Sequence, residues 1–300
     1  MDSDQNYSHV KRSLSLLVVG LVGFAACGGP TAPAPSRSSP SPVQRGSITV
    51  AGLERTYVLF QPLSLDPKQV VPLVIALHGY TVSATWMEET THFDALAEKA
   101  GFVVVYPQGT GNSWNAGTCC GNNNNDDVGF FKALIDKLVR TANIDPKRIY
   151  ATGMSNGGFM AQRLGCELSA QITAVASVSG SLVTASCAPS RAISVLEIHG
   201  TEDQTVPYQG GSIAGIGALP PTMSLMKRWA SLDGCAATPA LSQSGITTTY
   251  TWTPCRDGSS VVLDAVAGGG HSWFGPDAMP GSPDATQVAW TFFSQSPPLP

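Results

Sequence analysis

Charged side chains are scarce in this 300-residue chain. Only 13% of its residues are Asp, Glu, Lys or Arg, and the net charge is −4, whereas a globular domain usually has about a quarter charged residues. No basic run occurs, so the chain lacks the positive surface that nucleic-acid binding requires. Its polar surface must depend on Ser, Thr, Asn, Gln and Gly, a composition that we associate with secreted enzymes.

Metal-binding patterns are also missing. The seven cysteines contain no Cys-x-x-Cys pair, and no histidine lies near them in the sequence, which argues against a zinc site. The polar run 122–127 could be read as a calcium loop, but a polar turn leading into a helix cap explains it better. We therefore expect no metal and no cofactor.

The apolar stretch near the N-terminus is too short to cross a membrane. It covers residues 14–26, follows two basic residues, and has the length of a signal-peptide core, whereas a spanning helix needs about 20 residues. We predict an export signal over residues 1–26. The small residues before Cys27 resemble a lipoprotein cleavage box, although Phe24 departs from it, so Cys27 is a candidate lipidation site. The alternative is an ordinary signal peptide.

Residues 27–46 are rich in proline and serine, with five prolines. Such a segment cannot bury a core and should be an extended tether. The alternative is a disordered propeptide.

Six cysteines remain beyond Cys27, and an even number in an exported chain suggests three disulfides. Cys235 and Cys255 lie in the same C-terminal segment and are expected to pair. The other four would then form two bonds in an order that the sequence leaves open: Cys119 and Cys120 with Cys166 and Cys187.

From residue 47 to about 296, strand-like runs alternate with helical patterns. The sequence predicts an antiparallel pair at 47–50 and 56–60, followed by these strands: 72–77, 102–106, 148–152, 175–178, 194–198, 247–252 and 261–266. Helices are predicted at 93–99, about 127–139, 156–166, 225–232 and 284–293. This alternation predicts a mostly parallel sheet with helices on both faces, and about 250 residues suit one domain.

A serine between two glycines follows the run 148–152. The segment Gly153-Met154-Ser155-Asn156-Gly157 has the G-x-S-x-G pattern of a nucleophile elbow, in which a tight strand-to-helix turn exposes the serine hydroxyl. The pattern predicts nucleophilic acyl transfer by Ser155. The pattern alone is weak evidence for a catalytic serine, so the acid and the histidine that would act with Ser155 must also be found.

A carboxylate and a histidine follow the serine in the order that an α/β-hydrolase requires. Asp203 lies in the loop after the strand 194–198, with Glu202 as the alternative, and His271 lies in a glycine-rich loop after the strand 261–266. His271 would take the proton of Ser155, and Asp203 would orient His271 and stabilise its cation.

Two backbone N–H groups should stabilise the oxyanion. Asn156 follows the nucleophile, and Tyr80 lies in the loop after the strand 72–77, with Thr81 as the next candidate. His78 and His199 end predicted strands, and we interpret both as structural.

These motifs resemble the polyhydroxybutyrate depolymerase and feruloyl esterase family of secreted α/β-hydrolases. The matching stretches lie between residues 77 and 273: 77–79, 114–121, 126–130, 153–158, 199–208 and 270–273. The resemblance implies an esterase for plant cell-wall phenolic esters or hydroxyalkanoate polyesters, with Ser155, Asp203 and His271 as its triad. Tyr80-Thr81 departs from many members, which leaves the shape of the acyl pocket open.

Two features bear on the substrate. Trp114 and Trp273 lie near the predicted site in the sequence, where each could stack on a substrate ring or simply be packed. Only about 45 residues separate the elbow from Asp203, which leaves little room for a lid domain. An open site would suit a bulky or polymeric ester.

We therefore predict an exported serine carboxylic-ester hydrolase of the feruloyl-esterase type that acts through an acyl-enzyme. A hydroxyalkanoate polymer or oligomer hydrolase is the alternative, and a non-catalytic surface binding protein is the alternative from another class. We expect a monomer in the bacterial cell envelope, where its only membrane contact would be a lipid at Cys27, or an extracellular protein.

Overall fold

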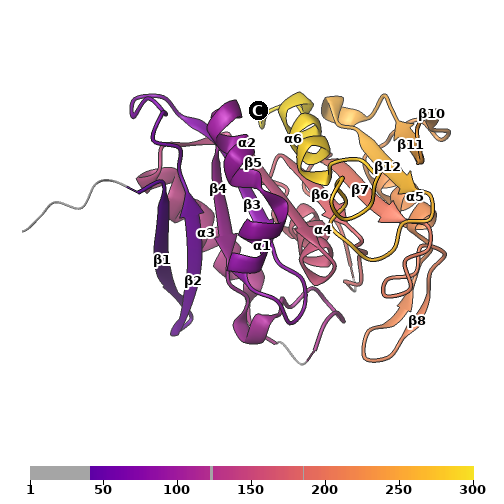
Figure 1. Cartoon of the computed structure of the whole chain (residues 1–300), viewed down its shortest axis with the longest axis horizontal. Helices are drawn as coiled ribbons and strands as arrows, with labels where there is room; N and C mark the ends of the chain where they lie inside the picture. Colours follow the sequence, from indigo (N-terminus) through magenta and orange to yellow (C-terminus); the bar gives the residue numbers. More distant parts are fainter. Residues whose placement is uncertain (1–40, 122–123, 185) are drawn as a thin grey trace, which may run out of the picture. The chain divides into compact units, whose positions relative to one another are not determined.

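A ten-stranded sheet forms the centre of the fold (Figure 1). The structure is a computed structural model that describes residues 41–121, 124–184 and 186–300. The predicted export signal, Cys27 and the tether up to residue 40 lie outside the described residues, as do two residues of the polar run 122–127.

The strands alternate with helices along the chain, as predicted. Those of the large sheet are β1 (Val43–Val50), β2 (Leu53–Phe60), β3 (Val71–Leu77), β4 (Val103–Pro107), β5 (Ile144–Met154), β6 (Ala174–Val178), β7 (Ser194–Gly200), β10 (Ala240–Ser244), β11 (Thr247–Trp252) and β12 (Val261–Val266). They are ordered β1-β2-β4-β3-β5-β6-β7-β12-β11-β10.

The six central strands, from β4 to β12, run parallel to one another. At one edge β1 and β2 are antiparallel, and at the other edge β11 and β10 are antiparallel. Every residue of β3, β4, β6 and β7 is buried, because helices cover both faces of a parallel sheet and its strands are therefore continuously apolar. The predicted mostly parallel sheet is confirmed.

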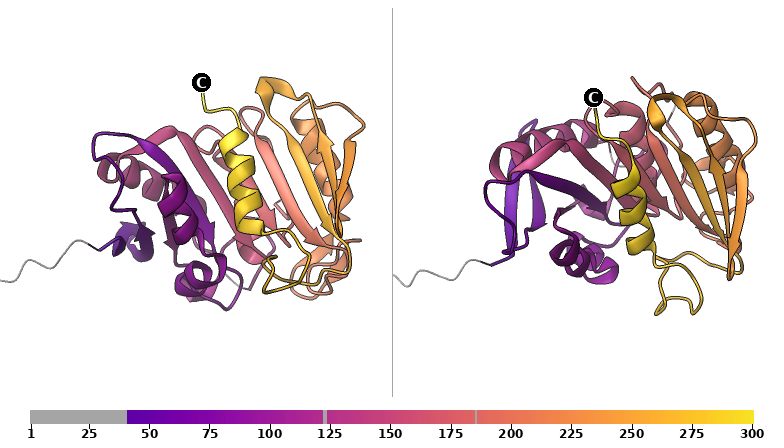
Figure 2. Two further views of the ribbon diagram at one scale, coloured as in Figure 1. Left: turned by 45° about the horizontal axis from the view of Figure 1, so that its top comes forward. Right: turned by 90° about the horizontal axis from the view of Figure 1, so that it is seen from above.

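Among the described residues, six α-helices pack on the two faces of the sheet (Figure 2). One face carries α1 (Ala84–Thr91), α2 (Phe93–Ala100) and α6 (Ala285–Gln295); the other carries α3 (Asp127–Thr141), α4 (Asn156–Glu167) and α5 (Thr222–Leu232). Asp126 caps α3 by accepting the Gly129 N–H at 2.8 Å, and Asp284 caps α6 by accepting the N–H groups of Thr286 and Gln287.

Several elements differ from the sequence expectation. The strand β1 begins at Val43, so residues 43–46, which the prediction placed in the tether, pair with β2. The strand β5 begins at Ile144 rather than at residue 148, and it includes Pro146 next to an irregularity in the pairing with β3. The helix α1, the edge strand β10, and a small hairpin of β8 (Gly211–Ile213) and β9 (Gly217–Leu219) were not predicted.

No lid domain is present among the described residues. Between β7 and α5 the chain forms only the β8–β9 hairpin, which projects at the lower right in Figure 1. In the same described part of the chain, no helix is long and apolar enough to span a bilayer.

The predicted pairing of four cysteines is wrong. Cys119 is bonded to its neighbour Cys120, and Cys166 to Cys187, while Cys235 pairs with Cys255 as predicted. Cys119 lies beside Asn156 at the start of α4, and Cys166 lies ten residues further along the same helix, about 15 Å away at the usual rise. A disulfide requires Cα atoms within about 7 Å, so the two cannot meet.

Cys187 is close to Cys166, with 5.0 Å between their Cα atoms and a sequence separation of 21. Replacing both by serine should lower the free energy of unfolding by about 3 kcal/mol, because the unfolded chain then gains the freedom of an open loop. Denaturant unfolding would measure the loss. An unchanged midpoint, with the bond verified in the parent by peptide mapping, would contradict the prediction.

Candidate active site

Ser155 occupies a strained turn between β5 and α4. Its backbone angles are φ 54° and ψ −123°, a region that a residue with a side chain rarely adopts. The Ser155 N–H donates to Val178 O at 2.9 Å, which ties the turn to the end of β6. A Cβ on Gly153 would meet the Gly157 backbone, and one on Gly157 would meet Leu77 O. The two glycines therefore permit the close approach of strand and helix.

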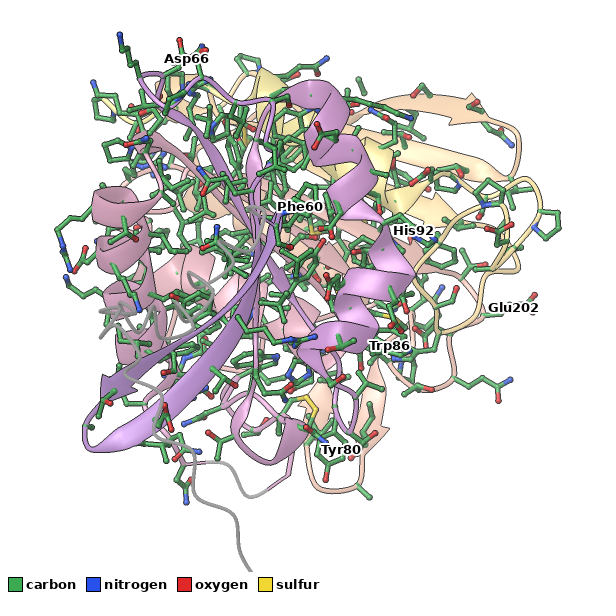
Figure 3. The ribbon with its side chains drawn as sticks, turned by 60° about the vertical axis from the view of Figure 1, so that its left-hand side comes forward. Phe60, Asp66, Tyr80, Trp86, His92 and Glu202 are labelled. Atoms are coloured by element: carbon green, nitrogen blue, oxygen red, sulfur yellow. A yellow bond between two sulfur atoms is a disulfide. The ribbon has the colours of Figure 1, made fainter. Side chains whose placement is uncertain are left out.

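Asp203 and His271 meet through loops that follow β7 and β12. His271 Nδ1 lies 2.7 Å from Asp203 Oδ2, and because a carboxylate only accepts, Nδ1 carries the proton and Nε2 is left as the basic nitrogen. Asp203 is buried and His271 is half-buried. Glu202 is exposed and projects outward in Figure 3, so Asp203 rather than Glu202 contacts the histidine.

The environment of Asp203 keeps it ionised. Burial alone would raise the pKa of this carboxyl, but the hydrogen bond and charge of His271, the Val206 N–H and the charge of His199 together lower it. Asp203 Oδ1 accepts the N–H groups of Thr205 and Val206, both at 2.8 Å, while Oδ2 faces His271. Each carboxylate oxygen thus has its own partners, and the orientation of the group is defined.

Ser155 and His271 line one pocket of about 550 Å³. Its other walls are mostly apolar: Tyr80, the Cys119–Cys120 disulfide, Gly121, Phe159, Thr205, Val206 and residues 213–216 at the tip of the β8–β9 hairpin. Tyr80 is 47% exposed, and Figure 3 shows its ring at the lower end of the molecule, near a disulfide. The carboxyl ends of the parallel strands converge there, where ligands usually bind in open α/β sheets.

Two backbone donors near Ser155 have no acceptor among the described residues, namely the N–H groups of Tyr80 and Asn156. The Thr81 N–H instead donates to Asn112 O at 2.9 Å, which makes Thr81 unavailable. The loop that carries Tyr80 is close to the elbow, because a Cβ on Gly79 would lie 3.6 Å from both Met154 O and Ser155 Cβ.

The His78 ring fixes this loop through hydrogen bonds to the backbone. Its Nδ1–H donates to Gly79 O at 2.7 Å, and its Nε2 accepts the Gly109 N–H at 2.9 Å. Burial lowers the pKa of His78 to about 4, despite the hydrogen bond to Gly79. The ring is therefore neutral at neutral pH, as a packed structural histidine would be.

Trp114 and Trp273 are packed in the interior, away from the pocket of Ser155. The Trp114 indole is fully buried and donates to His78 O at 2.9 Å; that of Trp273 is 6% exposed and donates to Thr286 Oγ1 at 3.0 Å. Neither lines the pocket of Ser155. The aromatic walls that sequence reasoning missed are Tyr80, which it considered only for its N–H, and Phe159.

The Asn156 side chain joins the elbow to the disulfide loop. Its Oδ1 accepts the Trp114 N–H at 2.7 Å, and its Nδ2 donates to Trp114 O at 3.0 Å. The described residues contain no cluster of ligands that could hold a metal ion.

Known esterases resemble this chain both in fold and in sequence. An acetyl xylan esterase from Aspergillus awamori superposes with a TM-score of 0.63 over 84% of this chain and 99% of that one, at 16% identity. A Nocardia uniformis subsp. tsuyamanensis protein assigned as an esterase, NocK, is 33% identical over 89% of this chain and 90% of its own. Feruloyl esterase B of Piromyces equi is 31% identical over 73% of this chain, which spans only 42% of that longer protein.

The fold and the relatives define a carboxylic ester hydrolase with the α/β-hydrolase fold. Residues 55–220 match the family described as esterase PHB depolymerase. The chain belongs to this family, as its motifs predicted.

The buried neutral His78 predicts a pH-dependent stability. Its pKa is lower in the folded chain, about 4, than the 6.5 of a free histidine, so the unfolded chain binds more protons between these values. Stability should therefore rise with pH from 4 to 6.5, with His78 contributing up to about 3 kcal/mol of the rise. His78→Gln should reduce this slope in urea-unfolding curves at pH 4.5 and 7; an unchanged slope would show that His78 is not buried in its neutral form.

Proposed function

We propose that Ser155, His271 and Asp203 act as the catalytic triad of a serine esterase. The hydrogen bond between His271 and Asp203, in a pocket that Ser155 also lines, is the observation that carries the proposal. Ser155 attacks the ester carbon while His271 Nε2 takes its proton, and His271 then protonates the leaving alcohol. Water repeats the sequence on the acyl-enzyme.

The N–H groups of Tyr80 and Asn156 are proposed to bind the oxyanion of the tetrahedral intermediate. Both are backbone donors that need no reorganisation during the reaction, and removal of one such donor typically costs about 3 kcal/mol of transition-state stabilisation. The start of α4 adds its positive dipole end next to Asn156.

The substrate class that we propose is a phenolic ester of plant cell-wall polysaccharide. The relative from Piromyces equi carries the name feruloyl esterase, and the pocket beside Ser155 has the aromatic walls Tyr80 and Phe159 and a volume of about 550 Å³, which is enough for an aromatic acyl group. No lid domain covers the pocket among the described residues, which would leave room for a polysaccharide leaving group.

The hydroxyalkanoate alternative is favoured by the family description, which names a PHB depolymerase. The same apolar pocket would accept a 3-hydroxybutyrate unit. The non-catalytic binding protein stays the alternative of another class, and the paired Asp203 and His271 oppose it.

We further propose that the enzyme is exported and, through Cys27, anchored to a lipid. The disulfides support export, because such bonds persist in oxidising compartments. The domain organisation is then a signal over residues 1–26, a tether that ends where β1 begins at Val43, and a catalytic domain that extends to about residue 296.

The triad predicts the effects of two substitutions. Ser155→Ala should abolish ester hydrolysis and labelling by a fluorophosphonate probe, because the nucleophile is lost. Asp203→Asn should leave the protein folded but lower kcat by about 10⁴-fold, because His271 would adopt the wrong tautomer. Hydrolysis of 4-nitrophenyl acetate would measure both, and full probe labelling of the alanine variant would exclude Ser155 as the nucleophile.

The substrate test compares methyl ferulate with a 3-hydroxybutyrate trimer, using Ser155→Ala to subtract background. We expect turnover of methyl ferulate that the variant lacks. Turnover of the trimer alone would move the assignment to polyester metabolism. Failure of both substrates together with failure of the probe would favour the binding protein.

Activity should also depend on pH through His271. Only the neutral imidazole can act as a base, so kcat/KM should fall on the acid side as the ring becomes protonated. A pH–rate profile checks this expectation. A kcat/KM that does not fall at any acid pH at which the protein stays folded would contradict the role of His271 as general base.

A further inference from the structure

A second histidine lies directly behind the proposed acid. His199 lies one residue before the end of β7 and has no exposed surface, and its Nε2 is 3.6 Å from Asp203 Oδ2. The sequence suggested only a structural histidine. In the structure its ring contacts a buried carboxylate as well as a backbone carbonyl.

Both ring nitrogens of His199 face oxygen atoms that accept hydrogen bonds, one of a carboxylate and one of a backbone carbonyl. Nδ1 lies 2.9 Å from Glu197 Oε1, and Nε2 lies 2.8 Å from Val206 O. A neutral imidazole has one N–H and one acceptor nitrogen, so it would place a lone pair against one of these oxygens. The cation has an N–H for each, and it satisfies both.

The hydrogen-bond donors around Glu197 favour its ionised form. This carboxylate is fully buried and accepts the Gly180 N–H at 3.0 Å on Oε1 and the Gln162 amide at 2.8 Å on Oε2. Gln162 in turn accepts the indole N–H of Trp229 on α5 at 2.8 Å, which fixes the orientation of its amide. Donors that point at a carboxylate favour its charged form.

The contact with Val206 connects this pair to the proposed triad. Val206 donates its N–H to Asp203 Oδ1 and accepts the His199 Nε2–H on its carbonyl. His199 therefore holds the turn that orients Asp203. Its charge also lies beside Oδ2, the oxygen that binds His271.

We propose that His199 is a permanent imidazolium, paired with the Glu197 carboxylate, which positions Asp203 and keeps it ionised. The proposal rests on the proposed role of Asp203 as the acid of the triad. His199 touches no substrate, so it is a positioning residue rather than a catalytic one.

The electrostatic balance around the ring agrees with this assignment. Among the described residues, three titratable side chains face His199: Glu197, Asp203 and the ring of Tyr208, whose centroid is 5.8 Å away. Burial lowers the pKa of His199, but the hydrogen bond and charge of Glu197, the Val206 carbonyl and the charge of Asp203 outweigh it, and the pKa is raised.

The protonation state can be measured without any assay of activity. In the full chain labelled with ¹⁵N and ¹³C, the ring of residue 199 is assigned through its own backbone, so no variant is needed. We expect both ring nitrogens to carry protons at pH 7, where a free histidine, with a pKa of about 6.5, is mostly neutral. A single protonated nitrogen at pH 7, with the other proton on Glu197 or absent, would overturn the proposal.

The positioning role is tested with His199→Gln. Glutamine can still donate to Val206 O but has no charge. We expect kcat to fall by about 10- to 100-fold, with a smaller change in KM. The acid limb of the kcat/KM profile should also move to higher pH, because the lost positive charge no longer opposes protonation of the neighbouring Asp203–His271 pair.

His92→Gln is the matched control, because His92 is exposed and lies outside the pocket, and it should behave as the parent. A lower kcat with an unmoved acid limb would indicate a structural role only and would refute the electrostatic part. If the glutamine variant does not fold, the resonances of the parent still decide the charge. If the parent hydrolyses no ester, the proposed function fails while the protonation state of His199 remains measurable.

Discussion

The strained turn at Ser155 is the constraint on which the rest of the site depends. A residue with a side chain avoids φ 54° and ψ −123°, so the conformation must be imposed by its surroundings. The buried β5 on one side, α4 on the other, and the hydrogen bond to Val178 O impose it. Gly153 and Gly157 make the packing possible, because any Cβ there would collide with the neighbouring backbone. The packing of the core thus stabilises an unfavourable backbone conformation that exposes the Ser155 hydroxyl.

The proposed partners of Ser155 come from loops that follow other parallel strands. Strands of a parallel sheet place their carboxyl ends at one edge, so the loops after β3, β7 and β12 approach the elbow although they are distant in sequence. Two of these loops are held by polar contacts: His78 bonds the loop of Tyr80, and the Val206 N–H bonds Asp203. The proposed triad is therefore a property of the sheet edge and of these contacts.

Behind the edge lies a buried network of polar groups. It connects Trp229 on α5, Gln162 on α4 and the pair of Glu197 and His199 on β7. Each contact places a donor against an acceptor, which is what such a network requires to be stable in a low-dielectric interior. Through Val206 the same network reaches the turn of Asp203.

Much of the fold was predictable because it depends on local signals. The continuous apolar run 72–77, the caps Asp126 and Asp284, and the order of Ser155, Asp203 and His271 are properties of short segments. Short, weakly patterned elements were missed, such as β10, whose five residues are all exposed. The cysteine pairing was also wrong for Cys119 and Cys166, because two cysteines near the same helix can be separated by its length.

The sequence by itself determined the fold class, the family and the segments from which a nucleophile, an acid and a base would come, because each depends on a motif and on the strand beside it. Only the tertiary structure decided what surrounds them. It buried Trp114 and Trp273, formed the pocket walls from Phe159 and the β8–β9 hairpin, and placed His199 between two carboxylates. These contacts join residues far apart in the chain, and no local pattern records which of them will meet.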